Sequence, residues 1–317
     1  MTAAPVLSFD LGGTRMRAAL VAGDGSVLAM AEGATPARDG VGAVLDGLCT
    51  LAAACLAQGP APRAAGLCAP GPLDAARGVM LAPPTLQGWR NVPASALLGD
   101  RLGLPVLLEN DANAAALGEQ LFGAGQGARS LVFITVSTGI GGGVIVDGHV
   151  LRGRGGLAGE IGHMKIAEHS PECACGARGC FEALASGSAL GRRAAEQRRG
   201  APDGAAPPTG RDVIEAARGG DRLALRLVAG HARWLGRGFA NLLHLYAPDV
   251  LVMGGGLANG FDLLAPRIRA EIAQSAMPDY RDTPLLRAAL GDAAGLVGMA
   301  HIVRQAAPDS GRERTHG

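Results

Sequence analysis

The sequence predicts a two-lobed α/β fold built from a duplicated unit. A strand, a glycine turn, a second strand and an Asp-Gly hairpin occur near the N-terminus and again over 131–151. In both copies the turn directly follows an apolar strand. The length of 317 residues also exceeds what one small core usually takes up. We therefore expect two α/β lobes with a cleft between them.

Patterning predicts the elements of the first lobe. Apolar alternation, glycine turns and 3.6-residue periodicity are the evidence for them. In order, we expect strands at 6–10 and 15–22, a hairpin at Asp24-Gly25, a helix from about Gly40 to Gln58, strands at 64–69 and 105–109, and a helix at 112–122.

The same reasoning applies to the second lobe. We expect strands at 131–136 and 140–146, a hairpin at Asp147-Gly148, a surface loop from Arg199 to Arg211, helices over 212–246, a strand at 249–253 and a last helix near 295–307 that returns to the first lobe. The polar segment from Ala307 to Gly317 is expected to be frayed.

Composition excludes several classes of protein. Apolar residues make up 48% of the chain and charged residues 18%, which is typical of a well-buried globular protein. The net charge of +1 gives no reason to expect non-specific nucleic-acid binding. No apolar run reaches the roughly 18 residues of a membrane span. Six cysteines without a secretory signal favour metal binding in a reducing compartment over disulfides. We expect a cytoplasmic protein without nucleic-acid or membrane partners.

Three glycine-rich turns are candidate phosphate sites: Gly12-Gly13, Thr138-Gly139 and Gly254–Gly256. Backbone N–H groups in such turns bind phosphate, because no side chain blocks the approach and the amide dipoles point at the oxygens. One turn alone would more often be an ordinary hairpin. Three turns after apolar strands, two of them related by the repeat, favour a nucleotide site. The chain has neither a P-loop nor a convincing dinucleotide-binding fingerprint.

Polar residues at two strand ends are candidate catalytic groups. Asp10 precedes the first glycines, where a carboxylate would repel phosphate unless it holds Mg²⁺, directly or through water; an Asx turn is the alternative. Glu109-Asn110-Asp111 ends an apolar strand and opens a helix. Helix capping is common there, but three polar residues at the carboxyl end of a strand favour a ligand site. Asp111 could then accept a proton from an alcohol while Asn110 bonds a neighbouring hydroxyl.

The segment from Gly159 to Glu182 predicts a zinc site. His163 precedes a cluster of three thiols, Cys173, Cys175 and Cys180. One imidazole and three thiolates are the ligands of a closed tetrahedral Zn²⁺ site. The acids Glu160 and Glu182 flank these ligands, so a metal would hold both in one place. Solvated loop charge is the alternative for the two acids. The remaining cysteines are expected to be ordinary buried thiols.

Together these segments resemble the ROK family of bacterial sugar kinases and repressors, within the actin-like ATPase superfamily with its ribonuclease H-like fold. The resemblance covers nearly the whole chain, and its most specific part is the cysteine segment with its upstream Gly-Glu-Ile-Gly-His. The segments that carry it are Asp10–Thr14, Glu109–Asp111, Ser137–Gly143, Ala158–His163, Cys173–Glu182 and Gly254–Gly256. The implied fold is a two-lobed actin-like one with duplicated βββαβα units and an inter-lobe cleft.

The resemblance also implies an activity and its residues. Asp111 would be the general base that takes the proton from a sugar's 6-hydroxyl as it attacks the γ-phosphate of ATP. The sugar would contact Gly71, Asn91, Asn110, Asp111, Glu160, His163 and Glu182. Mg·ATP would be surrounded by Asp10, Gly12, Gly13, Thr14, Arg15, Thr138, Gly139, Gly255 and Gly256. Structural Zn²⁺ would bind His163, Cys173, Cys175 and Cys180. Thr85 and Arg15 depart from the Asn and Lys common in the family, which puts a sugar contact at 85 in doubt.

The expected domains are residues 1–113 joined by the C-terminal helix, about 296–317, and residues 114–295 with the zinc-bearing sugar loop. The resemblance implies a homodimer or homotetramer. Glucose is the expected substrate, and N-acetylmannosamine and N-acetylglucosamine are alternatives. A non-catalytic regulator is less expected, because such family members carry a winged helix-turn-helix before the nucleotide turn and only nine residues precede Asp10 here.

Overall fold

The computed structural model describes residues 4–197 and 206–306. These residues form two compact units. The first takes in residues up to 118, 153–157 and those from 292 on, and the second takes in 119–152 and 158–291. The predicted domain limits at 113 and 296 stay a prediction. No helix in the described part of the chain is long and apolar enough to cross a membrane.

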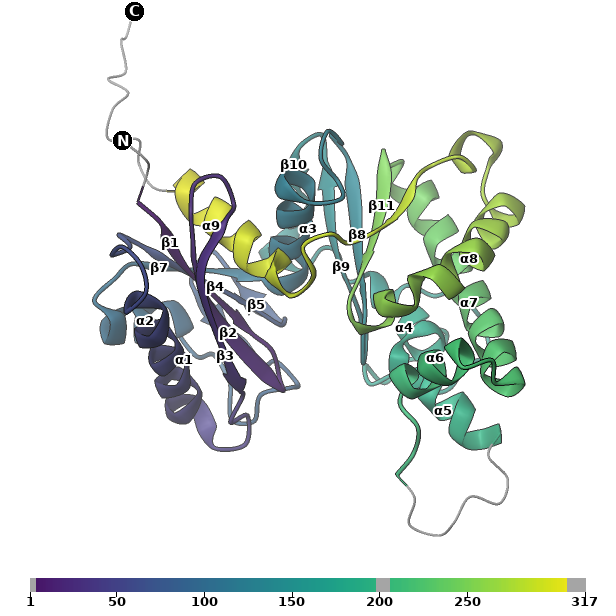
Figure 1. The fold of residues 1–317 in the computed structure, drawn as a ribbon, viewed down its shortest axis with the longest axis horizontal. Helices are drawn as coiled ribbons and strands as arrows, with labels where there is room; N and C mark the ends of the chain where they lie inside the picture. Colours follow the sequence, from purple (N-terminus) through teal and green to yellow (C-terminus); the bar gives the residue numbers. More distant parts are fainter. Residues whose placement is uncertain (1–3, 198–205, 307–317) are drawn as a thin grey trace, which may run out of the picture. The chain divides into compact units, whose positions relative to one another are not determined.

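The first unit is built on a five-stranded sheet of order β3-β2-β1-β4-β7 (Figure 1). β1 pairs antiparallel with β2 and parallel with β4, and β7 continues the parallel part. The strands are β1 Val6–Leu11, β2 Arg15–Val21, β3 Val27–Ala34, β4 Ala65–Ala69 and β7 Val106–Asn110, with a small ribbon of β5 Leu73–Asp74 and β6 Val79–Met80.

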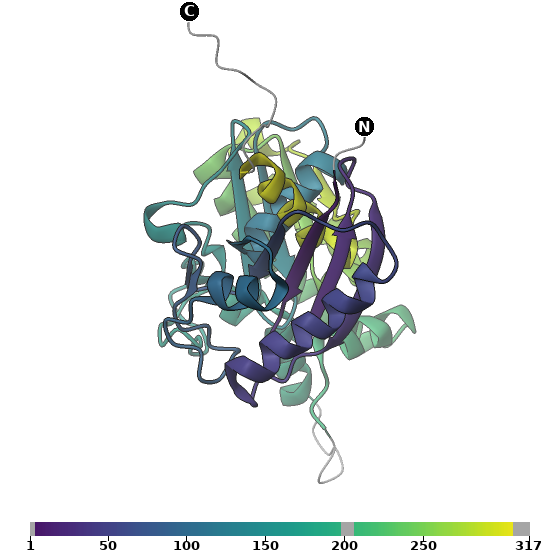
Figure 2. The same cartoon turned by 90° about the vertical axis from the view of Figure 1, so that its left-hand side faces the viewer.

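Helices cover the first sheet. They are α1 Gly40–Leu56, α2 Ala94–Leu102 and α9 Ala294–Ala306. The helix α3 Asp111–Phe122 packs closely against α9 at Gly118 and Gly298. In Figures 1 and 2, α1 and α2 lie along one face of the sheet, and Figure 1 shows α9 on the opposite side. The core between them is made of apolar side chains such as Phe9, Leu45 and Leu67, all three fully buried. The segment Arg154–Gly156 adds a short 3₁₀ turn, η1.

The second unit repeats the same strand order, β10-β9-β8-β11-β12. Its strands are β8 Leu131–Val136, β9 Ile140–Val146, β10 His149–Val150, β11 Val250–Gly254 and β12 Leu285–Arg287. Its helices are α4 Phe181–Ala185, α5 Gly187–Gln197, α6 Gly210–Arg218, α7 Arg222–Tyr246 and α8 Phe261–Ser275, with 3₁₀ turns η2 Ile161–His163, η3 Gly256–Gly260 and η4 Pro278–Tyr280. A further 3₁₀ turn, η5 Gly291–Ala293, precedes α9.

The shared strand order confirms the predicted α/β fold with a duplicated unit. Both predicted hairpins are present, because β2 pairs with β3 and β9 pairs with β10, each in antiparallel register. The prediction of a loop as far as Arg211 is wrong at its end. The Thr209 side chain and Asp212 form a capping box that starts α6 at Gly210. Most of the rest of that predicted loop, and all of the predicted frayed tail, lie outside the described residues.

Candidate active site

The first glycine turn joins β1 to β2 and is held by backbone hydrogen bonds. The Gly12 N–H donates to the Arg15 carbonyl at 2.9 Å, and the Thr35 hydroxyl donates to the Gly12 carbonyl at 2.7 Å. A Cβ at Gly13 would lie 2.6 Å from the Cβ of Thr85. Glycine is therefore favoured at 13, and Thr85 packs against the turn. Thr14 and Arg15 are exposed, and Arg15 contacts Glu32 at 3.6 Å.

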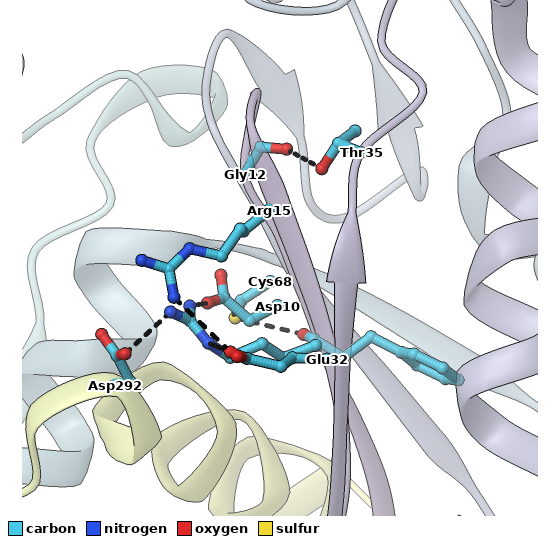
Figure 3. A network of polar contacts seen from close by, with 9 residues as sticks. Asp10, Gly12, Arg15, Glu32, Thr35, Cys68 and Asp292 are labelled. Atoms are coloured by element: carbon cyan, nitrogen blue, oxygen red, sulfur yellow. Dashed lines mark hydrogen bonds and ion pairs between the residues drawn. The ribbon is translucent and has the colours of Figure 1, made fainter. Parts of the chain in front are cut away.

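Asp10 lies at the centre of a charged network beside this turn (Figure 3). In the β1–β2 register Asp10 faces Arg17, whose Nη1 donates to Oδ2 at 2.9 Å. The Nη2 of Arg17 contacts Asp292 at 2.9 Å, and its Nε lies 3.5 Å from Glu32. Burial raises the pKa of the Asp10 carboxyl, and the Arg17 guanidinium opposes part of that rise. The other oxygen, Oδ1, lies 3.9 Å from the Cys68 sulfur.

Sequence reasoning missed the role of Arg17. The short turn at Gly12–Thr14 places residues 10 and 17 opposite each other in an antiparallel ladder, so the register could have predicted the pair. Arg17 is itself only 9% exposed, so the pair belongs to the interior of the unit. The structure thus shows Asp10 held by a protein cation through one carboxylate oxygen.

The polar residues after β7 form the start of α3, where one side chain caps the helix and the next presents a carboxylate. The side-chain Oδ1 of Asn110 accepts from the N–H groups of Ala112 at 3.0 Å and Asn113 at 3.1 Å, so Asn110 does cap α3. Asp111 is the first residue of the helix, and its Oδ1 accepts from the Ala112 N–H at 2.7 Å. A helix N-terminus favours a negative charge. The corner therefore presents an oriented carboxylate at the carboxyl end of a strand.

Glu109 keeps this corner in place. It is 3% exposed, and its Oε1 accepts from the Asn110 N–H at 2.9 Å and from the Asn113 side-chain amide at 3.1 Å. A buried carboxylate needs such partners. Glu109 is therefore a structural residue. The sequence did not indicate this role, because Glu109 lies directly before the two candidate site residues Asn110 and Asp111.

Two of the other predicted sugar contacts, Gly71 and Asn91, lie on loops of the first unit. Gly71 follows β4, and Asn91 precedes α2 with a positive φ of 50°. The Asn91 N–H donates to the Leu81 carbonyl at 2.8 Å. Backbone hydrogen bonding therefore holds the Asn91 loop in a defined shape.

The second and third glycine turns lie side by side in the second unit. The Ser137 N–H donates to the Gly139 carbonyl at 2.9 Å, which closes the turn between β8 and β9. Gly255 follows β11 with φ 82°, and a Cβ there would lie 2.6 Å from the Val136 carbonyl oxygen. Only glycine suits that conformation and that approach. A cavity of about 860 Å³ borders Thr138 and Gly256, with α5 and α6 forming much of its wall.

The four predicted zinc ligands come together in the second unit. Their ligand atoms, one each from His163, Cys173, Cys175 and Cys180, all lie within 4.8 Å of one another. The sulfurs of Cys175 and Cys180 are 3.7 Å apart, and the Cys173 sulfur is 3.7 Å from the Nδ1 of His163. A tetrahedron with Zn–S bonds of about 2.3 Å has S···S edges of about 3.8 Å. The donor set and its spacing fit Zn²⁺.

The two acids beside the cluster differ in their surroundings. Glu160 is exposed and directly precedes η2, which carries His163. Glu182 begins the first turn of α4, and its Oε2 accepts from the Ile140 N–H at 2.9 Å. Its Oε1 lies 3.8 Å from the Cys173 sulfur. Glu182 therefore links the cysteine cluster to the second glycine turn, a long-range contact that sequence reasoning did not anticipate.

The chain is similar to known proteins over nearly its whole length. The model of the ROK family matches residues 6–306. The chain belongs to the ROK family. Among family members, the glucokinase of Thermotoga maritima is 33% identical over 95% of this chain and 97% of its own length. The N-acetylmannosamine kinase of Shigella flexneri is 36% identical over 94% of this chain and 98% of its own length.

A ROK-family glucokinase from Streptomyces griseus, solved in complex with glucose and AMPPNP, has a similar structure. The TM-score is 0.85 at 37% identity, with 95% of this chain and 99% of that one covered. Family membership and the fold class predicted from the resemblance are thereby confirmed. The roles predicted for individual residues stay predictions.

Proposed function

We propose that this protein catalyses the ATP-dependent phosphorylation of a hexose at its 6-hydroxyl, with glucose as the preferred acceptor. The observation that carries the proposal is that the chain combines glycine turns, whose amides can bind phosphate, with a carboxylate at the end of a strand. The chain is also similar to a glucokinase solved in complex with glucose and AMPPNP. Phosphoryl transfer asks the protein mainly to position its substrates and to stabilise charge, so few reactive side chains are needed.

In this proposal Asp111 accepts the proton of the attacking hydroxyl. The Ala112 N–H orients its Oδ1, and the start of α3 favours the ionised form that a base requires. The side-chain NH2 of Asn110 donates to a sugar hydroxyl, while its Oδ1 caps α3. Gly71 and Asn91 complete the sugar contacts from the first unit.

The nucleotide phosphates bind the amides of the glycine turns. Gly12, Gly13 and Thr14 belong to the first turn, and Thr138, Gly139, Gly255 and Gly256 belong to the paired turns of the second unit. The rest of the nucleotide has space beside the paired turns. The 860 Å³ cavity borders Gly256, and a second cavity of about 460 Å³ borders it too, with Arg211, Arg218 and Arg287 in its wall. Arg15 adds a positive charge at the first turn.

Mg²⁺ would neutralise phosphate charge when it is bound with ATP. Asp10 would hold the hydrated ion through Oδ1, because Oδ2 is paired with Arg17. Zinc would be structural, because His163 and the three cysteines fill all four positions of its tetrahedron. That zinc holds the loop from which Glu160, His163 and Glu182 contact the sugar. His163 presents Nδ1 to the thiols, which leaves Nε2 as its sugar-facing nitrogen.

N-acetylmannosamine is the second candidate acceptor. It is favoured by the 36% identity with an N-acetylmannosamine kinase over nearly the full length of both chains, a value close to the 33% found for a glucokinase. We further propose a cytoplasmic homodimer or homotetramer.

ADP release tests the proposal directly. The purified protein is assayed with Mg·ATP and, in separate reactions, glucose, mannose, N-acetylglucosamine and N-acetylmannosamine. We expect the highest kcat/KM for glucose. Turnover of N-acetylmannosamine without glucose turnover would replace glucose by the second candidate. No sugar-dependent ADP release with any of the four would contradict the kinase proposal.

A further inference from the structure

Lys165 is the single lysine of the chain. The other 28 of its 29 lysine and arginine residues are arginines. Lys165 lies two residues after His163 and eight residues before Cys173, the first of the three clustered thiols. All the remaining lysine or arginine positions of the chain hold arginine, so the one lysine is the residue next to the candidate metal-binding cluster. Its surroundings therefore call for a physical explanation.

The ammonium group of Lys165 contacts a sulfur of the cluster. Nζ donates to the Cys180 Sγ at 2.9 Å, and Cys180 is fully buried. The backbone places them opposite each other, because Lys165 and Cys180 form an isolated antiparallel β-bridge. The Ile166 N–H donates to the Gly179 carbonyl at 2.9 Å and the Phe181 N–H donates to the Met164 carbonyl at 2.8 Å on either side of the bridge. The contact is therefore built into the pairing of the two segments.

The neighbouring glycine allows a close approach of the two segments. Gly179 has φ 83°, and a Cβ at this position would lie 2.2 Å from the Ala167 carbonyl oxygen, whereas its distance to the Lys165 Cδ would be an ordinary 3.5 Å. Glycine at 179 therefore lets the cysteine segment lie against the segment that carries Lys165. A compact ammonium donates to a single sulfur, whereas the planar fork of arginine suits a two-oxygen acceptor. Lysine is the basic residue that this geometry accommodates.

The contact between Lys165 and Cys180 places a positive charge beside a negatively charged metal cluster. Zn²⁺ with three thiolates and a neutral imidazole carries a net charge of −1, and the Glu182 carboxylate near Cys173 adds to the negative field. Arg178, the arginine inside the cysteine segment, contacts Glu172 at 3.7 Å and the Ser170 carbonyl at 3.2 Å. The Lys165 ammonium thus hydrogen-bonds to the cluster, whereas Arg178 contacts Glu172 and the Ser170 carbonyl instead. Partners of this kind orient metal ligands and tune their binding.

We propose that Lys165 is a positioning residue for the zinc site: it holds the Cys180 thiolate in its metal-binding orientation and balances the charge of the cluster, so that zinc is released slowly. The inference rests on the proposed zinc site. It extends that proposal, because the four ligands alone do not explain how a cluster with a net negative charge is stabilised beside Glu182.

Zinc release from the intact protein tests this inference. The wild type, Lys165→Met, Lys165→Arg and Arg178→Met are loaded with zinc, and the metal content is measured by atomic emission. Release to a chromophoric chelator is then followed over time. Arg178→Met is the matched control, because it removes a cation from the same loop without touching a sulfur.

We expect Lys165→Met to release zinc about 10- to 100-fold faster than the wild type, the usual range for the loss of such a partner. Lys165→Arg should recover part of the difference, and Arg178→Met should release zinc at the wild-type rate. Circular dichroism confirms that each variant is folded. If Lys165→Met does not fold, the comparison of Lys165→Arg with the wild type decides, since the imperfect donor should still release zinc faster.

Three results would overturn the proposal or its basis. Equal release rates for Lys165→Met and the wild type would overturn the role of Lys165. An equal acceleration in Arg178→Met would show that only general surface charge matters, which also overturns it. A wild type that neither contains nor takes up zinc would instead contradict the proposed zinc site, and would do so before any variant is compared.

Discussion

A buried histidine makes the stability of the second unit depend on pH. His231 lies in α7 with no exposed surface, and its Nδ1 accepts from Arg193 at 2.5 Å. Arg193 also donates to the Leu184 carbonyl at 2.9 Å, which ties α5 to α4, the short helix that carries Glu182. Burial, together with the nearby Arg193 charge, lowers the pKa of His231 to about 3 from its usual 6.5.

The direction of the pH effect follows from this shift. The unfolded chain takes up a proton near pH 6.5, while the folded protein resists protonation down to about pH 3. Acidification therefore favours the unfolded state, and the stability that the neutral imidazole provides is complete above pH 6.5 and lost as the pH falls below it. For these two pKa values, linkage gives a loss of about 2 kcal/mol in the free energy of unfolding between pH 8 and pH 5.

Urea unfolding at several pH values measures this loss. The chain has two tryptophans, Trp89 in the first unit and Trp234 in α7. A Trp89→Phe background therefore leaves Trp234 fluorescence as a reporter of the second unit. In this background His231 is compared with His231→Gln, whose amide oxygen can still accept from Arg193 but does not titrate.

We expect the free energy of unfolding to fall by about 2 kcal/mol more in the His231 protein than in His231→Gln between pH 8 and pH 5. The other titrating groups are common to both proteins, so their contributions cancel in the difference. Parallel pH dependences in the two proteins would refute the reasoning, because they would mean that His231 titrates alike in the folded and unfolded chains.

Three further predictions concern the candidate site. Asp111→Asn should lower kcat by roughly 10²- to 10⁴-fold with little change in the KM for glucose, measured by ADP release; a kcat near the wild-type value would remove its role as base. Gly13→Ala should raise the KM for ATP because its Cβ meets a threonine, whereas the control Gly23→Ala adds a Cβ in open space and should have no effect. Arg17→Met should raise the Mg²⁺ concentration for half-maximal rate and lower the free energy of unfolding by about 1–3 kcal/mol, since it leaves a largely buried carboxylate unpaired. Glu32→Gln, which removes only the more distant partner of that arginine, should change neither quantity much, and an equal effect would contradict the last prediction.

The features that could be predicted from the sequence are local ones. The strand, turn and hairpin of each repeat depend on alternation and on glycine within about twenty residues, and the structure has both copies with the same strand order. The cluster of His163 with three cysteines could be predicted for a similar reason. Their residue types and spacing are specific, and one short β-bridge between Lys165 and Cys180 brings the loop together.

Contacts between distant segments could not be predicted in this way. The hydrogen bond from the Ile140 N–H to Glu182 joins residues 42 positions apart, and nothing in either local pattern points to the other. The use of the Asn110 side chain as a cap was an open alternative, and only the structure of the helix start decided it. Arg17 is the intermediate case, because the hairpin register places it opposite Asp10, but the third partner, Asp292, comes from the far end of the chain.

By itself, then, the sequence determined the duplicated α/β unit, the three glycine turns, the residues of the His/Cys cluster and the resemblance to the ROK family. Each depends on residue type and short-range spacing, because strand alternation and turn type are set by residues that are close together in the chain. The tertiary structure alone decided which charges are neutralised and which side chains support the site. Asp292 beside Arg17, the Ile140 N–H beside Glu182 and Arg193 beside His231 come from separate elements, and packing brings these partners together, because burying a charged or polar group without a partner costs free energy.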